Sequence, residues 1–408
     1  MPRPAVLFIL ITMMIDAMGI GLMVPVLPNL LQEVGAGDLG RAALWGGVLS
    51  TAFAVMQFLF GPVLGGLSDR FGRRPVLLVS LVFMALDYLV MALAGSIWLL
   101  LAGRIVGGIT ASTQATANAY MADISAPEDR AANFGLIGAA FGVGFVLGPL
   151  IGGFLAEWGT RAPFYAAALL SGMNAVFGYF VLRETLPQSA RRSFSWRRAN
   201  PLGAFVQMRA LPGVGALLLV FFLYQVAFTV YPSVWSFFGK ERFGWEPSMI
   251  GLSLALFGIM MAIVQGGLIR PVIRLLGERG TVAFGHVFDI AAFVAIAFVA
   301  SGTLALILVP IAALAAVITP ALQGIMSKSV GPDQQGELQG ALVSVGALAT
   351  ILSPMLMTAT FARFTAADAP VYLPGAPFLL SALLIAAGLT VFSLFKPKPA
   401  RGVAGGMN

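Results

Sequence analysis

Twelve apolar runs, each long enough for a helix to cross a lipid bilayer, dominate this sequence and restrict its possible folds. A helix needs about 20 apolar residues to span the hydrocarbon, and the runs fall into two sets of six. The first set covers residues 5–31, 42–67, 75–95, 98–122, 132–156 and 162–182. The second set covers residues 213–238, 248–270, 281–301, 303–327, 338–362 and 374–395. We therefore predict an all-α integral membrane protein with twelve transmembrane helices in two six-helix bundles.

The composition leads to the same class of protein. Hydrophobic residues make up 59% of the chain and charged residues 10%, which leaves too little polar surface to cover a soluble protein. The sequence has no cysteine and a single histidine, so we expect no disulfide, no thiol catalysis and no metal site of its own. It also has no paired nucleophile and base and no phosphate-binding loop. The sequence therefore predicts a protein that is not an enzyme and needs no cofactor.

The basic residues predict the orientation in the membrane. With both termini in the cytoplasm, 18 of the 24 Lys and Arg residues lie on the cytoplasmic side and five lie outside, as the positive-inside rule requires. These residues are spread over loops, so nucleic-acid binding is not expected. We predict a multi-pass protein of the inner (plasma) membrane, whose first run is a span and not a removed signal. Its predicted parts are an N-terminal bundle (1–183), a cytoplasmic linker (184–212), a C-terminal bundle (213–396) and a cytoplasmic tail (397–408).

A charged loop joins the second and third runs. Residues 65–77 read GGLSDRFGRRPVL, and the spacing G-x-x-x-D-R-x-G-R-R resembles the corresponding loop in transporters of the major facilitator superfamily. Residues 267–279 keep spaced arginines at the equivalent place in the second half but lack the Asp-Arg pair. This weak repeat indicates two pseudo-symmetric halves with substrate bound between them. The residues expected to form a gate are Gly65, Asp69, Arg70, Gly72, Arg73 and Arg74.

Ionisable residues inside the spans are the main candidates for function, because a charge in hydrocarbon is costly without a cavity or a partner. Asp87 and Arg104 are expected to compensate each other, directly or through water. Asp16 either bonds near its helix end or faces substrate. His286 and Asp289, at i and i+3, share one helix face, although His286 could also lie at the membrane interface. Uncharged candidates for the same cavity are Gln57, Gln225 and Gln265.

The fifth run carries a glycine pattern, GAAFGVGFVLGPLIGG at 138–153. Gly144, Gly148 and Gly152 recur every four residues and lie on one face, where they allow close helix packing. Pro149 is expected to kink this helix, because it cannot donate to the helical hydrogen bonds. Beyond close packing, the pattern resembles the fifth-span motif of drug/proton antiporters within the superfamily.

Other segments narrow the resemblance over nearly the whole chain. They include DAMGIGLMVPVLP (16–28), LDYL (86–89), RETLP (183–187), ERFGW (241–245) and QQGELQG (334–340), and they resemble the twelve-span tetracycline efflux antiporters. The resemblance implies export of a drug, carried as a complex with a divalent metal such as Mg²⁺, in exchange for a proton. It implies further that the functional unit is a monomer whose partners are the drug, protons and lipid. By motif position, the essential acids are Asp16, Asp69, Asp87 and Asp289, and the intramembrane arginine is Arg104.

One position departs from that family. Its members commonly have a histidine in the eighth span, where this sequence offers Met260 and Met261. His286 in the ninth span is a candidate replacement, and Asp289 is the expected proton carrier because it has no obvious basic partner. The residues expected to bind substrate are Asp16, Gln57, Asp87, Arg104, Gln225, Gln265 and Asp289. The alternatives are a broader multidrug/proton antiporter, a proton-coupled nutrient importer and a nontransporting membrane sensor.

Overall fold

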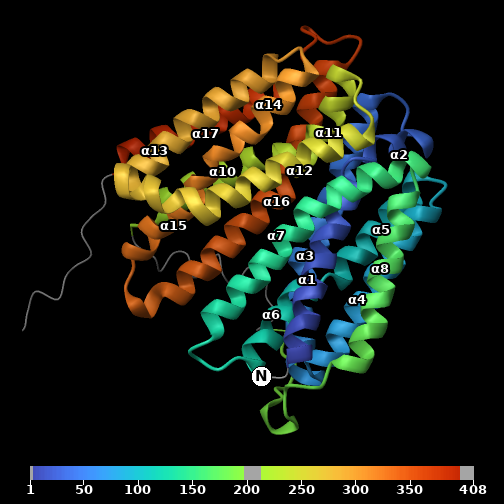
Figure 1. Cartoon of the computed structure of the whole chain (residues 1–408), viewed down its shortest axis with the longest axis vertical. Helices are drawn as coiled ribbons and strands as arrows, with labels where there is room; N and C mark the ends of the chain where they lie inside the picture. The colour runs from blue at the N-terminus through green and yellow to red at the C-terminus, as the bar shows by residue number, and fades with distance from the viewer. Residues whose placement is uncertain (1–2, 197–212, 396–408) are drawn as a thin grey trace, which may run out of the picture.

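The computed structural model describes residues 3–196 and 213–395, and every regular element within these ranges is a helix. The rest of the predicted linker, from residue 197, and the predicted tail lie outside the described residues. Figure 1 shows two helical bundles, one from each half of the chain. The N-terminal bundle contains α1 (Arg3–Met23), α2 (Leu27–Glu33), α3 (Leu39–Phe71), α4 (Arg73–Leu93), α5 (Ile97–Thr110), α6 (Thr113–Ile124), α7 (Arg130–Leu155), the 3₁₀ turn η1 (Ala156–Trp158) and α8 (Ala162–Val181).

The second bundle follows a short 3₁₀ turn, η2 (Gln188–Ala190). Two of its spans are interrupted by non-α turns, the π-helical η3 and the 3₁₀ turn η4, and a further 3₁₀ turn, η5, directly precedes α16. Its elements are α10 (Gly215–Phe228), α11 (Val230–Phe243), α12 (Pro247–Ile263), η3 (Val264–Leu268), α13 (Ile269–Phe298), α14 (Gly302–Ala312), η4 (Ala313–Val317), α15 (Ile318–Lys328), η5 (Pro332–Gln334), α16 (Gln335–Thr365) and α17 (Ala376–Leu394).

Ten helical stretches among the described residues are long and apolar enough to cross a membrane. One of them, Pro247–Phe298, contains 52 residues and bends at Gly277, whose φ of 67° and ψ of 170° are not helical. It therefore supplies two spans. The predicted run 98–122 is divided into α5 and α6 by a break at Ala111 and Ser112, so neither piece is long enough alone. Counting these two cases gives the twelve spans that the sequence predicts.

Side-chain caps begin several of these helices at their solvent ends. Asp38 accepts a hydrogen bond from the backbone N–H of Arg41 at 2.9 Å and begins α3. Ser96 begins α5 and Ser301 begins α14 in the same way. Such caps satisfy amide groups that a helix leaves without a partner in its first turn. They fix where each span starts, and with it the depth of the residues that follow.

The two bundles contact each other mainly along α3 with α16 and along α7 with α12. Glycines make these contacts close: a Cβ at Gly47 would overlap the Thr358 hydroxyl, and one at Gly251 would overlap the Pro149 carbonyl. A Cβ at Gly153 would likewise lie 2.6 Å from the carbonyl oxygen of Pro247. All these residues lie in the halves of their helices that are remote from the start of α1, which we call the closed end.

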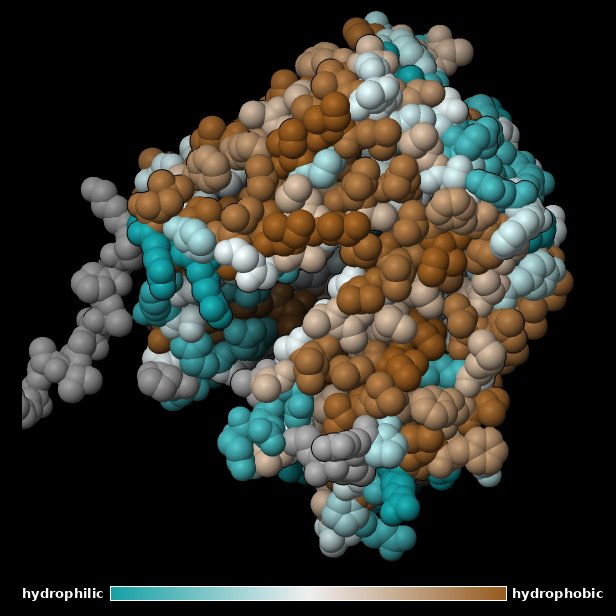
Figure 2. Space-filling model, in the orientation of Figure 1, coloured by the Kyte–Doolittle hydropathy of each residue, from teal (hydrophilic) through white to brown (hydrophobic). Residues whose placement is uncertain are grey.

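At the opposite end, the open end, the same helices separate. A Cβ at Gly61 or Gly65 of α3, or at Gly138 of α7, would have no neighbouring atom within 4 Å. The same is true of Gly336 and Gly340 at the start of α16. Figure 2 shows the surface hollowed between the two bundles on this side. The structure therefore has a cleft between its halves that is open at one end only.

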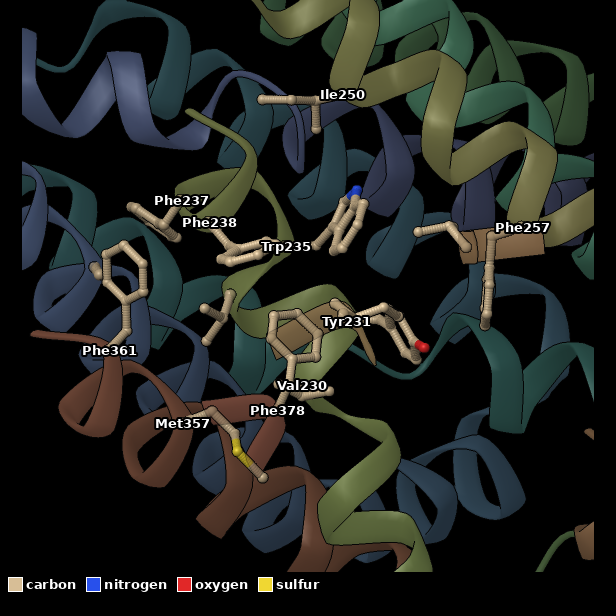
Figure 3. Packing of buried hydrophobic residues seen from close by; sticks show 14 of the residues in the cluster. Val230, Tyr231, Trp235, Phe237, Phe238, Ile250, Phe257, Met357, Phe361 and Phe378 are labelled. Carbon is tan, nitrogen blue, oxygen red and sulfur yellow. The ribbon is translucent and has the colours of Figure 1, made fainter. Parts of the chain in front are cut away.

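Aromatic side chains fill the C-terminal bundle near the closed end (Figure 3). The Tyr231 ring lies 4.7 Å from the Phe257 ring and 5.7 Å from the Phe293 ring, centroid to centroid. Trp235 is fully buried, and its indole N–H donates to the Ser253 hydroxyl at 2.8 Å. Large aromatic rings bury much apolar area and pack edge to face. This cluster fills the interior of the C-terminal bundle near the closed end.

Candidate functional site

Asp87 on α4 and Arg104 on α5 form a direct ion pair inside the N-terminal bundle. Both side chains are buried, and the guanidinium also lies 5.0 Å from the centroid of the Phe53 ring. Small residues allow this approach, because a Cβ at Gly107 would lie 2.8 Å from the Asp87 carboxyl carbon. Of the two arrangements that the sequence allowed, the structure has the direct one. In a buried pair of this kind, each charge favours the charged form of the other.

Asp16 lies on α1, a helix that packs along α7 and α8. Its side chain is partly buried and lies within electrostatic range of Tyr88 on α4. One turn before it, Thr12 exchanges hydrogen bonds with Asn174 of α8, with the amide nitrogen donating at 3.0 Å. No cation is within salt-bridge distance of Asp16 among the described residues. Its carboxyl therefore differs from that of Asp87, which has a fixed countercharge.

His286 and Asp289 are both buried within the C-terminal bundle, on the second half of α13. The Nδ1 of His286 lies 2.8 Å from the Val282 carbonyl oxygen, so it carries the proton and leaves Nε2 as an acceptor. Neither this Nε2 nor Oδ2 of Asp289 has a hydrogen-bond partner among the described residues. The His286 side chain is 0% exposed and lies between the Tyr224 and Phe392 rings, so it faces the interior of its bundle and not lipid.

The glutamines lie in different environments. Gln57 is exposed and stands one turn before Gly61, on the part of α3 that borders the open end. Gln265 is exposed in η3, and Gln225 is half-buried on α10. Met260 and Met261, at the place where the resembled family has histidine, pack against Val264 and the η4 segment. These two methionines therefore make apolar contacts where a titratable ring was expected.

The charged loop is held in place by hydrogen bonds within the loop and to α6 and α8 of the same bundle. The Arg73 guanidinium donates to the Asp69 carboxylate at 2.7 Å and to the Asp123 carboxylate at 3.3 Å. The Arg74 guanidinium donates to the Tyr179 carbonyl at 2.8 Å, and that of Arg70 lies over the Phe71 ring. Asp69 therefore pairs with arginine within its own bundle while this end of the cleft is open.

Glu184, from the RETLP segment, binds the start of α4. Its carboxylate accepts hydrogen bonds from the backbone N–H groups of Arg73 at 2.9 Å and Arg74 at 3.2 Å. Gly72 makes room for it: its φ is 109°, which favours glycine, and a Cβ there would overlap the carboxylate. Sequence reasoning used this glutamate only as part of a family motif. One feature of the sequence could have indicated this role. The acid directly follows the sixth span, on the side of the membrane where the third span begins.

The glycine face of α7 packs on α1 within one bundle. A Cβ at Gly144, Gly148 or Gly152 would approach the backbone of α1 too closely, at one contact for each helical turn. Pro149 contacts both neighbours, because its ring lies against Gly21 of α1 and its carbonyl lies against Gly251 of α12. The motif helix thus packs on α1 of its own bundle and touches α12 of the other bundle along its second half.

The closed end has a polar contact that sequence reasoning missed. The Lys240 ammonium on α11 donates to the side-chain oxygens of Asn29 and Gln32 on α2, at 2.7 Å for Gln32. The Ser236 hydroxyl, one turn earlier, donates to the Val24 carbonyl at 2.7 Å. The only sequence signal was a basic residue next to ERFGW, which was counted as a loop charge on the outside.

The described residues contain no group of three His, Cys, Asp or Glu side chains placed to bind a metal ion. A metal ion carried by a drug would be part of the substrate. What the site offers is a cleft bordered by two bundles, with one buried ion pair and two carboxyls that have no countercharge. Such an arrangement suits binding and proton exchange rather than bond-breaking chemistry.

Known proteins resemble this chain over most of its length. The model of the Major Facilitator Superfamily matches residues 9–354. The tetracycline resistance protein, class C, of Escherichia coli is 44% identical over 358 residues, which cover 88% of this chain and 90% of that protein. The class G protein of Vibrio anguillarum is 40% identical over 362 residues, which cover 88% and 91%.

A solved transporter structure also resembles this chain over most of its length. The human organic anion transporter MFSD10 superposes with a TM-score of 0.68 at 28% identity, covering 96% of this chain and 99% of that one. The fold and the sequence matches agree on a multi-pass membrane transporter that is not an enzyme. The chain belongs to the Major Facilitator Superfamily.

Proposed function

We propose that this protein exports a tetracycline-type drug, complexed with a divalent metal ion such as Mg²⁺, in exchange for protons. The observation that carries the proposal is the one-ended cleft between two bundles that each contain an intramembrane acid without a countercharge. The names of the most similar relatives supply the substrate class. Alternating access would expose the cleft to each side of the membrane in turn.

The positive-inside distribution of basic residues supports an orientation with both termini in the cytoplasm of an inner-membrane protein. The open end then faces the cytoplasm, from which the drug would enter. The functional unit would be the monomer, because each chain supplies a complete cleft. Export requires the contacts at the closed end to break and the open end to close, with the Asp69 loop acting as the gate on the cytoplasmic side.

The roles of the charged residues follow from their partners. Asp289 would carry the proton because it is buried without a cation, and His286 would assist on the same helix. Arg104 and Asp87 would bind substrate or hold the cleft in shape as a charged pair. Asp16 would serve substrate and protons in the N-terminal bundle. Drug contacts would also come from Gln57, Gln225 and Gln265.

A simple energy argument predicts electroneutral exchange. Moving one charge through 100 mV is worth about 2.3 kcal/mol, and one pH unit is worth about 1.4 kcal/mol. If a monovalent metal–drug cation leaves as one proton enters, the effect of the membrane potential cancels. The pH gradient alone then drives export, by about tenfold for each unit.

Drug uptake into inverted membrane vesicles tests this proposal. Uptake should require an imposed pH gradient and Mg²⁺, stop when EDTA removes the metal, and respond little to potential at zero gradient. Asp289→Asn should abolish coupled uptake, whereas Asp368→Asn, a matched change at an exposed loop acid, should not. Uptake that follows potential alone, or full exchange in Asp289→Asn, would be incompatible with the proposed mechanism.

The apolar surroundings of Met260 and Met261 favour a second candidate, a broader multidrug/proton antiporter. Drug susceptibility of cells expressing the protein separates the two. Resistance limited to tetracyclines supports the first candidate, and resistance that extends to unrelated cationic or neutral drugs supports the second. Wild-type protein that transports none of these compounds would point instead to a nontransporting sensor.

A further inference from the structure

In each bundle, a buried tyrosine lies against the intramembrane acid that has no countercharge. Tyr88 on α4 is 4% exposed and within electrostatic range of Asp16. A Cβ at Gly19 would overlap the Tyr88 hydroxyl. Because Gly19 lies at i+3 from Asp16 on the same face of α1, the hydroxyl lies over α1 one turn from the carboxyl.

The C-terminal bundle repeats this arrangement. Tyr231 on α11 is 3% exposed and within electrostatic range of Asp289. Its ring packs on Phe293, which lies at i+4 from Asp289 on α13. Both the Tyr231 hydroxyl and Oδ2 of Asp289 are buried without a hydrogen-bond partner among the described residues. The two groups are not bonded to each other, but they are complementary, since one can donate and the other can accept.

The two pairs use equivalent helices in exchanged roles. In the N-terminal bundle the acid lies on the first span and the tyrosine on the third. In the C-terminal bundle the tyrosine lies on the first span, and the acid lies on the third. The contact between first and third spans therefore brings an acid and a tyrosine together in both halves of the fold.

Tyrosine suits a carboxyl that gains and loses a proton. A phenol hydroxyl can donate to a carboxylate and can accept from a protonated carboxyl, so it can form a hydrogen bond with the acid in either state. Arginine can only donate, and the Arg104 guanidinium therefore holds Asp87 as a carboxylate. Asp87 and Tyr88 are neighbours in the chain but point in different directions. Asp87 faces α5, where Arg104 is its fixed partner, and Tyr88 faces α1, where Asp16 lies.

Few other polar groups face these pairs. Near Asp289, Tyr224 on α10 is within electrostatic range but is bonded to Thr319 on α15, and His286 lies on the acid's own helix. Near Asp16, α7 contributes glycines, and the Asn174 amide of α8 is already bonded to Thr12. The tyrosine hydroxyl is thus the available partner in each bundle.

We propose that Tyr88 and Tyr231 are positioning residues that hydrogen-bond Asp16 and Asp289 through one water, and make these two acids the proton-exchanging pair. The proposal rests on proton exchange as the proposed function. It separates the acids into two classes, with Asp16 and Asp289 exchanging protons and Asp87 permanently charged. An acid belongs to the first class if a tyrosine faces it and to the second if an arginine faces it.

Infrared difference spectroscopy of the whole protein in lipid vesicles tests the proposal without drug. The carbonyl bands of protonated Asp16 and Asp289 are assigned by their loss in Asp16→Asn and Asp289→Asn. Tyr88→Phe should move only the Asp16 band to higher frequency, and Tyr231→Phe only the Asp289 band, because each loses its hydrogen bond. The control is Tyr372→Phe, which removes a loop hydroxyl that donates to Glu241 at 2.6 Å and should move neither band.

Gly19→Ala provides a second variant, since it displaces the Tyr88 hydroxyl and should move the Asp16 band alone. In vesicles, both Tyr→Phe variants should lower proton-coupled exchange about tenfold, or about 1.4 kcal/mol, with unchanged drug binding. If the carbonyl bands of Asp16 and Asp289 have the wild-type frequencies in both Tyr→Phe variants, the proposal is overturned. If wild-type vesicles exchange no protons for drug, the proposed function fails, but the band shifts still decide whether the tyrosines hold the acids.

Discussion

Removing the Lys240 ammonium should release the closed end of the cleft. Its two hydrogen bonds to Asn29 and Gln32 join α11 of one bundle to α2 of the other. Lys240→Gln keeps most of the side-chain volume but removes the charge. Because the contact exists only while this end is closed, its loss destabilises the closed state relative to the state open at that end.

The size of the effect follows from the partners. A hydrogen bond to a charged group contributes about 1.5–3 kcal/mol. Lys240 is only partly buried and regains water when the end opens, so we take the lower value for each bond and halve it. The two bonds then contribute about 1.5 kcal/mol, which corresponds to a roughly tenfold increase in the population open at that end.

Thiol labelling measures this population directly, because the chain has no cysteine of its own. Ala43→Cys places a reporter on α3 between Gly40 and Gly47, the two glycines that face α16, and Ala43 is fully buried. A membrane-impermeant maleimide should label this reporter about tenfold faster when Lys240→Gln is added.

The matched control is Lys328→Gln. This lysine pairs with Glu278 at 2.7 Å within the C-terminal bundle, on the open side, so its loss should leave labelling unchanged. If Lys240→Gln labels no faster than this control, the hydrogen bonds at the closed end contribute nothing to its closure, and the reasoning is refuted.

Three further changes test other parts of the structure by thermal unfolding in detergent. Gly144→Ala should destabilise by about 1–3 kcal/mol because its Cβ would overlap a carbonyl of α1, whereas Gly142→Ala, which meets no atom within 4 Å, should not; equal effects would contradict the close packing. Arg104→Gln should cost about 3–5 kcal/mol by leaving Asp87 buried and unpaired, and adding Asp87→Asn should recover most of the loss. Glu184→Gln should cost about 1 kcal/mol by weakening the carboxylate's contact with the first amides of α4, and an unchanged midpoint would argue against that role.

The sequence predicts the spans well because the bilayer leaves little choice. A backbone inside hydrocarbon must satisfy its own hydrogen bonds, so each apolar run of sufficient length becomes a helix. The pairing of Asp87 with Arg104 was predictable for a similar reason, since each charge needs a partner and the fold puts the third and fourth spans together.

Contacts between distant segments could not be predicted in this way. Glu184 binds the start of α4 from 111 positions along the chain, and Lys240 reaches α2 from 208 positions. Such pairs depend on how the bundles are oriented, which hydropathy does not encode. The break between α5 and α6 at Ala111 and Ser112 was also missed, although the sequence becomes polar from Ser112 on, where the apolar α5 is followed by STQATANA.

The packing of α7 indicates which contacts move during transport. Its glycine face follows α1 for three turns, so separating these two helices would expose close backbone contacts along their length. Its contacts with α12 lie in its second half, from Val146 to Gly153. A change of access therefore costs least if α7 moves together with α1 as part of a rigid bundle while the shorter contact with α12 opens. The glycine motif then fixes the bundle that moves, and the few residues at the closed end set the free energy of moving it.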